Sequence, residues 1–259
     1  AVGGKLLASS AATSIASDVY GVIPPFVLMG LFVSATGMGR GTFDVAALLL
    51  KRVRGGLGLA TVGANAVFAA CTGTSIASAS IFTKIAVPEM VRYGHTTGFS
   101  VGVVAGSSVL GMLIPPSILF IIFGVIANVS IGDLFTSGIL PGIVLSVAFC
   151  ITISMLSYLR AQYVCVRPNA MHGTYRGPFE GKPAWYVAWK FMPICVLVGI
   201  VLGGIYGGIF TPIEAGGTGA LAAFLIALLR RELTLKIFWQ VALETGRVTA
   251  AICFLLMAA

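Results

Sequence analysis

Hydroxyl side chains gather around two unusual stretches of this 259-residue sequence, residues 71–75 (CTGTS) and residues 111–117 (GMLIPPS). Each stretch also contains glycine or proline, which interrupt helices and free backbone carbonyl groups for other partners. Oxygen ligands without a carboxylate suit a weakly held monovalent cation such as Na⁺ better than Ca²⁺ or Zn²⁺. Ser78 and Ser80 lie past the first stretch, where helix packing is the favoured role. The hydroxyl side chains in question belong to Thr72, Thr74, Ser75, Ser78, Ser80, Ser107, Ser108 and Ser117.

No catalytic arrangement accompanies these hydroxyls in the sequence. The stretch GTSIAS resembles a serine-nucleophile loop, but the histidines, His95 and His172, lie at the edge of an apolar run and in a basic connection. The sequence contains neither a phosphate-binding glycine-rich loop nor a cluster with metal-ligand spacing. Its five cysteines are predicted to be free thiols. The sequence therefore predicts neither an enzyme nor a protein with a bound cofactor.

The composition is that of a membrane protein. Hydrophobic residues make up 58% of the chain and charged residues only 9%, with a mean hydropathy of +1.03, whereas soluble domains carry roughly 25% charged residues. Most charge-free runs reach or exceed the roughly 20 residues that a helix needs to cross a bilayer. These runs are 19–39, 55–83, 93–132, 134–159 and 191–213. The sequence predicts an all-α polytopic membrane protein embedded in a lipid bilayer.

The formal net charge is +8, but the basic residues that produce it are not clustered into a patch that would bind nucleic acid. The basic residues lie in short connections between apolar runs, which is the positive-inside pattern of cytoplasmic loops. With these connections inside, the run 19–39 enters from outside, where Asp18 lies, and residues 43–54 form a short amphipathic interfacial helix. The basic residues of these connections are Lys51, Arg52, Arg54, Lys84, Arg92, Arg160, Arg167, Arg176, Lys182, Lys190, Arg230, Arg231 and Lys236.

The run 55–83 breaks this alternation, because basic residues flank it at both ends. An apolar segment that begins and ends on one side is a re-entrant hairpin, and the CTGTS stretch at its middle has the composition of a helix break. Each arm of about 13 residues reaches roughly 20 Å, so the tip is expected near the middle of the bilayer. Non-helical backbone at that depth is tolerated only where it is buried in protein or lines a cavity.

The run 93–132 is too long for one straight crossing, because about forty residues of helix would measure about 60 Å against a hydrocarbon core of about 30 Å. Its break at 111–116 is expected at the same depth as the hairpin tip, with Pro116 in the first turn of the second half-helix. Secondary transporters build ion and substrate sites from such discontinuous helices. The alternative is that each break serves helix packing alone, but their matched depth favours a site.

Glu214 is a further candidate, because it is a charged residue at the edge of two apolar runs. It follows Thr211 and Pro212 at the outer end of the runs 191–209 and 213–229. A glutamate in the first turn after Thr-Pro is also a favourable arrangement for a helix N-terminus. We favour this structural role.

Three blocks of sequence, in this order, resemble one family of transporters. They are FAACTGTSIASASIFTKIAVPEMVRYGH, GMLIPPSILFIIFGVIANVSIGDLFTSGILPGI and GGIYGGIFTPIEAGG, and the earlier stretch IPPFVLMGLFVSATG resembles the helix before the family's hairpin. Over nearly its whole length the chain is similar to the large, DctM-like membrane subunit of TRAP transporters, the tripartite ATP-independent periplasmic carriers.

The resemblance implies a permease that imports organic anions with a Na⁺ gradient, by an elevator-like movement of a mobile domain against a fixed scaffold. The family's substrates are mostly carboxylates, such as C4-dicarboxylates, sialic acid or keto acids. The implied partners are a small four-helix membrane subunit and a periplasmic substrate-binding protein. The implied location is the bacterial inner membrane.

By position, the resemblance assigns one Na⁺ site and one side of the substrate site to the two breaks. The family's hairpin tip has serines around its glycine, and threonines replace two of them here, which keeps the hydroxyls and adds methyl groups. The residues that would frame both sites are Thr72, Gly73, Thr74, Ser75, Gly111, Pro115, Pro116 and Ser117.

The family's fold is an inverted repeat, and the charge pattern agrees with it, since the run that starts near Thr245 is the expected counterpart of 19–39. Because the sequence begins without Met and ends inside an apolar run, we expect an internal part of a longer protein, with a second hairpin and a second Pro-Pro break beyond Ala259. The expected parts are scaffold and interfacial helices (1–54), the hairpin with the broken helix (55–133), a transmembrane helix with a cytoplasmic loop (134–190) and the start of the second repeat (191–259).

Two other functions stay open. A channel or passive facilitator could use the same broken helices, but it would not accumulate its solute against a gradient. A non-transporting membrane scaffold would have no use for the hydroxyls, so uptake would not change in Thr74→Ala or Ser117→Ala variants.

Overall fold

The computed structural model of the chain describes residues 21–166 and 184–258. Within these ranges the regular structure is helical apart from an isolated β-bridge between His95 and Cys165, which confirms the predicted all-α class for the described part. The helices are α2 (Ile23–Ala35), α3 (Met38–Leu49), α4 (Gly56–Thr72), α5 (Ser75–Arg92), α6 (Thr97–Ser108), α7 (Leu110–Leu113), α8 (Ile118–Ala127), α9 (Ile131–Leu159), α10 (Ala161–Val164), α11 (Ala184–Tyr206), α12 (Pro212–Leu229) and α13 (Leu235–Ala258). The residues named above that lie outside the described ranges are Asp18, Arg167, His172, Arg176 and Lys182.

Helices α4 and α5 form the predicted hairpin around the CTGTS stretch. Helix α4 ends at Thr72, and α5 begins at Ser75 with Thr74 as its N-cap. Between them Gly73 has a φ of 60°, a left-handed conformation that glycine adopts without steric penalty. The sequence therefore located the break between the two arms correctly.

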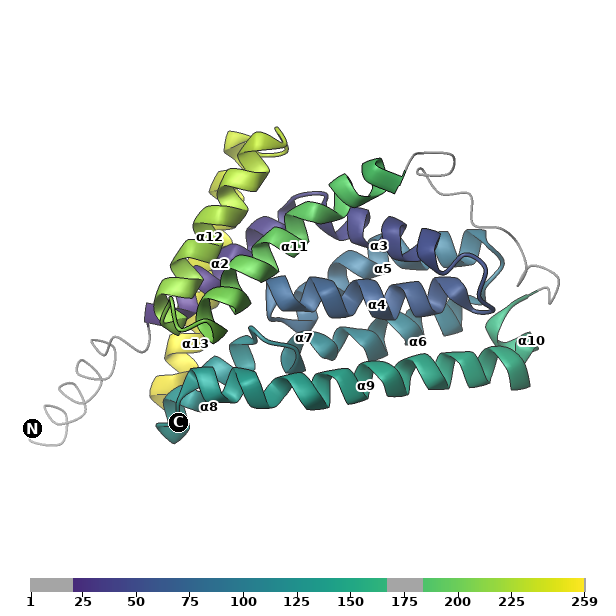
Figure 1. Cartoon of the computed structure of the whole chain (residues 1–259), viewed down its shortest axis with the longest axis horizontal. Coiled ribbons are helices and arrows are strands. Elements are labelled where there is room, and N and C mark those ends of the chain that lie inside the picture. The colour runs from purple at the N-terminus through teal and green to yellow at the C-terminus, as the bar shows by residue number, and fades with distance from the viewer. Residues whose placement is uncertain (1–20, 167–183, 259) are drawn as a thin grey trace, which may run out of the picture.

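Both outer ends of the hairpin lie against the C-terminal end of α9 and the short α10. The backbone of Gly55, before α4, packs against the side chain of Ser157. After α5, the amide of Thr96 donates to the carbonyl oxygen of Val164 at 2.9 Å. The segment thus enters and leaves at one end of the molecule (Figure 1), as the sequence predicts, while its position in a bilayer stays a prediction.

The run 93–132 forms a broken helix. Helices α6 and α7 make one arm and α8 the other, at an angle of 41°, and residues 114–117 between them are not helical. Helix α8 begins at Ile118 with Ser117 as its N-cap. The prediction that Pro116 lies in the first helical turn is therefore wrong, because the extended backbone of Ser117 (φ −120°, ψ 131°) keeps the proline outside the helix.

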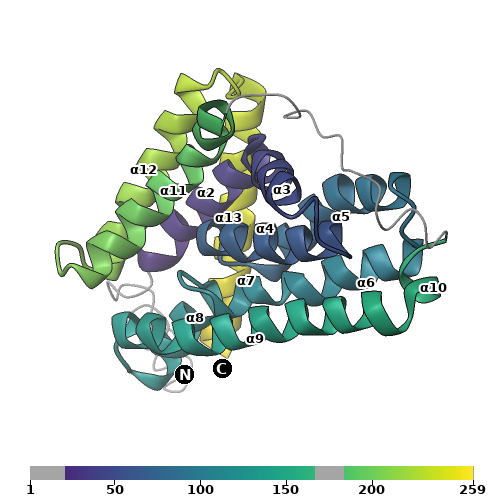
Figure 2. The ribbon, with the colours of Figure 1, turned by 45° about the vertical axis from the view of Figure 1, so that its right-hand side comes forward.

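Helix α9 runs alongside the broken helix over its length (Figures 1 and 2). A Cβ atom on Gly142 of α9 would lie 3.0 Å from the side chain of Ile114, so this part of α9 faces the break. The centre of the 29-residue helix is near Leu145, and the break therefore lies roughly 5 Å from it along the helix axis. The break thus faces the middle part of α9, and its depth in a bilayer stays a prediction.

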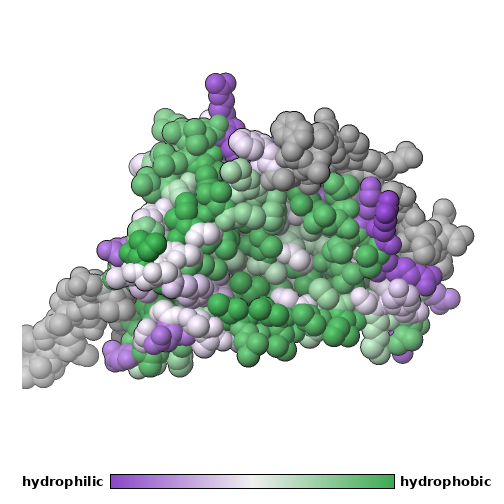
Figure 3. Space-filling view, in the orientation of Figure 1, coloured by the Kyte–Doolittle hydropathy of each residue, from purple (hydrophilic) through white to green (hydrophobic). Residues whose placement is uncertain are grey.

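Several of the described helices are long and apolar enough to cross a membrane. They are α9, residues Trp189–Tyr206 of α11 and α12, and the count rises from three to five if each bent pair, α2 with α3 and α6–α7 with α8, is one span. The surface over α9 is broadly apolar (Figure 3), and Leu140 and Val144 on it are 71% and 60% exposed. This surface suits contact with lipid or with other apolar helices.

The predicted interfacial helix over 43–54 is displaced in the structure. Helix α3 spans Met38–Leu49 and bends by 63° from α2. Residues 50–54 form turns instead, in which the amides of Val53 and Gly56 donate to carbonyl oxygens three residues earlier. These turns end the helix before the basic segment.

The elbow between α2 and α3 is fastened to the connection between α12 and α13. The Glu232 carboxylate accepts a hydrogen bond from the Gly37 amide at 3.1 Å and lies 3.2 Å from the Arg230 guanidinium. An ionised acceptor at a helix N-terminus stabilises the otherwise unpaired amides there.

Helix α13 begins at Leu235, ten residues before the apolar run expected from Thr245. A three-ring aromatic cluster holds this first part of the helix. Phe32 of α2 stacks on Phe238 of α13 at 6.2 Å between ring centroids, and both rings meet Phe224 of α12 edge to face. The run expected from Thr245 lies within this helix. The helix begins earlier than the run because one face of its first part is polar, which interrupts the hydropathy but not the helical structure.

Helices α11 and α12 form the expected pair that goes out and returns, and Glu214 lies in the turn that begins α12. Its amide donates to the Thr211 hydroxyl at 3.3 Å, and its carboxylate accepts from the Thr211 amide at 2.8 Å. This reciprocal capping box satisfies two backbone amides at the helix start. The structural role that the sequence favours for Glu214 is confirmed.

His95 lies buried in the turn between α5 and α6. Its ring stacks on Phe99, and its Nδ1 atom lies 3.2 Å from the carbonyl oxygen of Met90. Burial lowers the pKa of His95 below its usual value, against a smaller opposite effect of the hydrogen bond with Met90. The folded state therefore favours the neutral imidazole.

This burial predicts a pH-dependent stability. The contribution of neutral His95 is complete above about pH 6.5, the usual histidine pKa, and is lost as the pH falls from there toward the lowered pKa of the folded state. The melting temperature of the purified protein should therefore fall between about pH 7 and about pH 5. The decrease should be smaller in His95→Phe, which keeps the ring stacking; equal decreases in both proteins would contradict this role.

The aromatic cluster predicts a second effect on stability. Phe32 is only 2% exposed, so Phe32→Ala should destabilise the protein by about 3 kcal/mol or more and loosen α13 from α2. Phe254 of α13 is 72% exposed, and Phe254→Ala is the matched control with little expected effect. Thermal unfolding in detergent measures both, and similar melting temperatures for the two variants would refute the anchoring role.

Candidate functional site

The two chain breaks meet, backbone against backbone. The Ile118 amide, at the start of α8, donates to the carbonyl oxygen of Gly73 at 3.1 Å. A Cβ atom on Gly73 would lie 2.7 Å from the Pro116 carbonyl oxygen, and one on Gly111 would lie 2.6 Å from the Thr74 carbonyl oxygen. Side chains at these two positions would force the breaks apart. The structure therefore brings together the hairpin tip and the Pro-Pro segment that the sequence singled out separately.

The hydroxyl groups at the contact are held in place by the backbone. Thr74 Oγ1 accepts from the Ala77 amide at 3.3 Å as the N-cap of α5, whereas Ser117 Oγ donates to the Met112 carbonyl oxygen at 2.6 Å. Thr72 Oγ1 donates to the carbonyl oxygen of Phe68 at 3.2 Å. A hydroxyl group has two acceptor lone pairs, so each oxygen keeps capacity to bind a cation. That these oxygens bind Na⁺ stays a prediction.

The remaining predicted residues occupy three different positions. Ser75 is the partly buried first residue of α5, and the Pro115–Pro116 peptide bond, which is cis, crosses the break. Ser107 and Ser108 donate to carbonyl oxygens of their own helix, α6.

Ser107 also accepts a hydrogen bond from the buried Asn65 side chain of α4 at 2.6 Å. Ser78 is fully buried on α5, as expected for a packing residue, but Ser80 instead lines a cavity.

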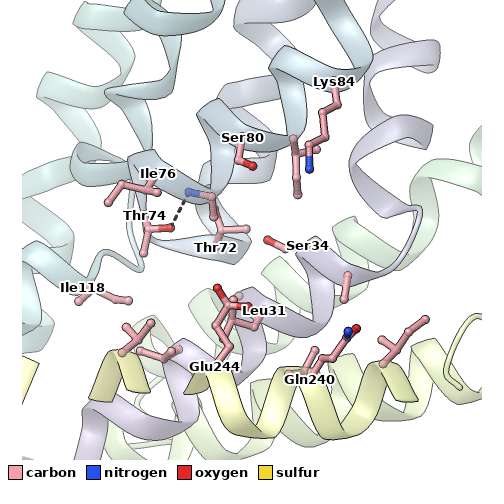
Figure 4. Close-up of a pocket in the computed structure, with 18 residues that line it drawn as sticks. Leu31, Ser34, Thr72, Thr74, Ile76, Ser80, Lys84, Ile118, Gln240 and Glu244 are labelled. Carbon is pink, nitrogen blue, oxygen red and sulfur yellow. Dashed lines mark hydrogen bonds between the residues drawn. The ribbon is translucent and has the colours of Figure 1, made fainter. Parts of the chain in front are cut away.

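This cavity, of about 520 Å³, opens beside the contact between the two breaks. Thr72, Thr74 and Ile118 line one end of it, and it extends along α5 between α2 and α13 (Figure 4). Its size lies in the range of small-molecule sites, roughly 300–1,000 Å³. The cavity is therefore large enough for a small organic solute next to the predicted cation ligands.

Four polar residues of the cavity were not predicted as site residues. Lys84 lies one turn after Ser80 on α5, and the sequence indicated only its role in topology. Glu244 belongs to the polar face of α13, which interrupts the apolar pattern at the start of that helix. A spacing of four residues, Ser80 to Lys84 and Gln240 to Glu244, was the signal that these pairs share helix faces. The four residues are Ser34, Lys84, Gln240 and Glu244.

Helix α2 supports the hairpin tip from the other side. A Cβ atom on Gly30 would lie 2.7 Å from the Thr72 carbonyl oxygen, so the two backbones are in close contact. Val27, Leu31 and Ser34 of the same helix continue along the cavity wall. The tip is thus enclosed by α2 as well as by the broken helix.

The sequence that forms these elements matches a known permease family. The family model for the DctM component of the tripartite ATP-independent periplasmic transporters matches residues 3–259. The chain belongs to this family. The resemblance seen in the three sequence blocks is therefore confirmed.

Individual DctM relatives differ in the solute for which they are named. The chain is 34% identical to the C4-dicarboxylate TRAP transporter large permease protein DctM of Pseudomonas aeruginosa, over 90% of the chain and 52% of the relative. It is 34% identical to the isethionate TRAP transporter permease protein DctMQ of Oleidesulfovibrio alaskensis (96% and 38%) and 31% identical to the 2,3-diketo-L-gulonate TRAP transporter large permease protein YiaN of Escherichia coli (92% and 53%).

The chain spans about half the length or less of these curated TRAP relatives. All three are named as transporter permease proteins, which agrees with the prediction that the chain is not an enzyme. Within the described residues, no group of three or more His, Cys, Asp or Glu side chains could hold a metal ion. The five cysteines are free thiols, as predicted.

The contact between the breaks predicts that Gly111 is needed for the stability of the fold. Gly111→Ala should destabilise the protein by about 1–3 kcal/mol, because the Thr74 carbonyl group must move away from the new methyl group. Gly102→Ala, on α6 where nothing lies within 4 Å of an added Cβ, is the control and should leave the melting temperature unchanged or raised. If both variants melt alike, the backbone contact does not matter for stability.

Proposed function

We propose that this chain is part of the large permease subunit of a Na⁺-coupled TRAP transporter that imports organic anions. Carboxylates such as C4-dicarboxylates, sialic acid or keto acids are the expected substrates. A small membrane subunit and a periplasmic binding protein are the expected partners, in the bacterial inner membrane. The observation that carries the proposal is the contact of two chain breaks beside a cavity of about 520 Å³.

The proposed mechanism is an elevator in an inverted-repeat fold. Residues 55–133, with the hairpin and broken helix, would be half of the moving part, next to scaffold residues 1–54. Residues 134–190 would connect them to the second repeat, which would begin at 191. Na⁺ would bind the oxygens of Thr72, Thr74, Ser75 and Ser117 together with freed carbonyl groups at the breaks.

The decisive experiment is uptake of radiolabelled carboxylates into proteoliposomes that hold the full-length gene product and its small subunit. Uptake should require both an inward Na⁺ gradient and the binding protein. A passive facilitator, the other candidate function, would equilibrate its solute and never accumulate it. Uptake without Na⁺ dependence would refute the proposed coupling.

The Na⁺ assignment predicts a specific change in Thr74→Ala. Loss of one oxygen ligand should raise the Na⁺ concentration for half-maximal uptake by roughly tenfold, which corresponds to about 1.4 kcal/mol. Thr74→Ser keeps the hydroxyl and should behave like the wild type. Ser117→Ala should resemble Thr74→Ala. Unaltered Na⁺ dependence in both alanine variants would remove these residues from the cation site.

A further inference from the structure

The cavity beside the breaks carries two opposite charges on facing helices. Lys84 projects from α5 and Glu244 from α13, and they are the two charged side chains in its described lining. Figure 4 shows the Lys84 ammonium group at the far end of the cavity from Thr74, and Glu244 projecting from α13 between them. Among the residues that the structure describes, neither side chain forms an ion pair within 4 Å.

Both charged side chains are exposed at the open cavity rather than buried in the protein. They form no ion pair with each other within 4 Å. A solute that entered the cavity could instead offer a partner to each. The charges of the described lining sum to zero, which favours a solute without net charge.

The two charges of the cavity would attract a zwitterion and a dianion to different degrees. A dicarboxylate would be attracted to Lys84 but repelled by Glu244, and like charges in contact at a binding site cost affinity. A solute with one carboxylate and one cationic group would match both side chains. The lining between the charges offers hydrogen-bonding groups on Ser34 and Gln240 and apolar contacts on Leu31, which suits a short carbon chain with polar ends.

We propose that this cavity selects zwitterionic solutes, with Lys84 binding the carboxylate and Glu244 binding the cationic group. The inference rests on the proposed transport function; among the carboxylates expected there, it selects those that also carry a cationic group and excludes C4-dicarboxylates. Glu244 is then the specificity-determining residue, since it is the one that rejects a second carboxylate.

Binding of matched probes to the full-length gene product, purified in detergent with saturating Na⁺, tests this assignment. The probes are pairs of equal chain length, 3-aminopropanoate with malonate, 4-aminobutanoate with succinate and 5-aminopentanoate with glutarate, measured by calorimetry. In at least one pair the zwitterion should bind about tenfold or more tightly than the dianion. Equal or tighter binding of the dianion in every pair, or no binding of any zwitterion, would overturn the proposal.

Two variants separate the roles of the charges. Glu244→Gln should reduce the preference for the zwitterion to below about threefold, whereas Glu244→Asp should keep it. Lys84→Gln should weaken both members of a pair by a similar factor, because each has a carboxylate. If the Glu244→Gln variant still prefers the zwitterion, Glu244 does not determine the specificity. If that variant also loses the Na⁺ dependence of binding, Glu244 acts in cation coupling instead.

The proteoliposome experiment distinguishes this inference from the proposed function. Na⁺-driven uptake of a dianion, with no preference for zwitterions, would refute the zwitterion cavity alone. Failure of every solute to accumulate with Na⁺ and the binding protein would refute the transport function as well.

Discussion

The structure depends on one constraint: two backbone interruptions inside an apolar helical protein must satisfy each other, because lipid offers no hydrogen-bond partners. The Gly73 carbonyl oxygen receives the Ile118 amide, and the Ser117 hydroxyl donates to the carbonyl oxygen of Met112. Backbone atoms can approach so closely because Gly73 and Gly111 have no Cβ. Helix α9 lies along the broken helix and α2 against the hairpin tip, so the neighbouring helices enclose this contact.

The same contact gathers helix termini of both polarities. Helices α5 and α8 begin there, while α4 ends there at Thr72. Helix N-termini favour anions, and the carbonyl groups at C-termini favour cations. A cation and a carboxylate bound side by side would each raise the affinity of the other, and such coupling is necessarily reciprocal. This reciprocity is the physical basis that symport requires, and it needs no charged side chain at the breaks themselves.

The sequence predicted the breaks well because their causes are local. Gly73 permits the left-handed turn, the two prolines prevent continuation of the helix, and Glu214 caps α12 from three residues away. The cavity could not be predicted in the same way. Glu244 reaches the hairpin only because α13 packs on α2 through rings distant in sequence, and the charge of Lys84 has the same appearance in a cytoplasmic loop as in a cavity wall. The positions of the chain breaks therefore follow from local sequence, whereas the charged side chains that line the cavity are determined by tertiary packing.

The contacts between the hairpin and its supporting helices bear on the elevator movement proposed above. Where α2 crosses the tip, Gly30 faces the Thr72 carbonyl group, and where α3 crosses the hairpin, Gly39 faces Phe68 and Ile81. Glycines at both crossings let the backbones approach closely, while larger side chains of α2 and α3 pack with the hairpin in one continuous core. Small sliding movements of packed helices are an established form of domain motion. The aromatic cluster and the contact of Glu232 with the elbow tie α2 to α12 and α13. The two breaks are joined backbone to backbone through Gly73 and Gly111, so they would move together in any such motion.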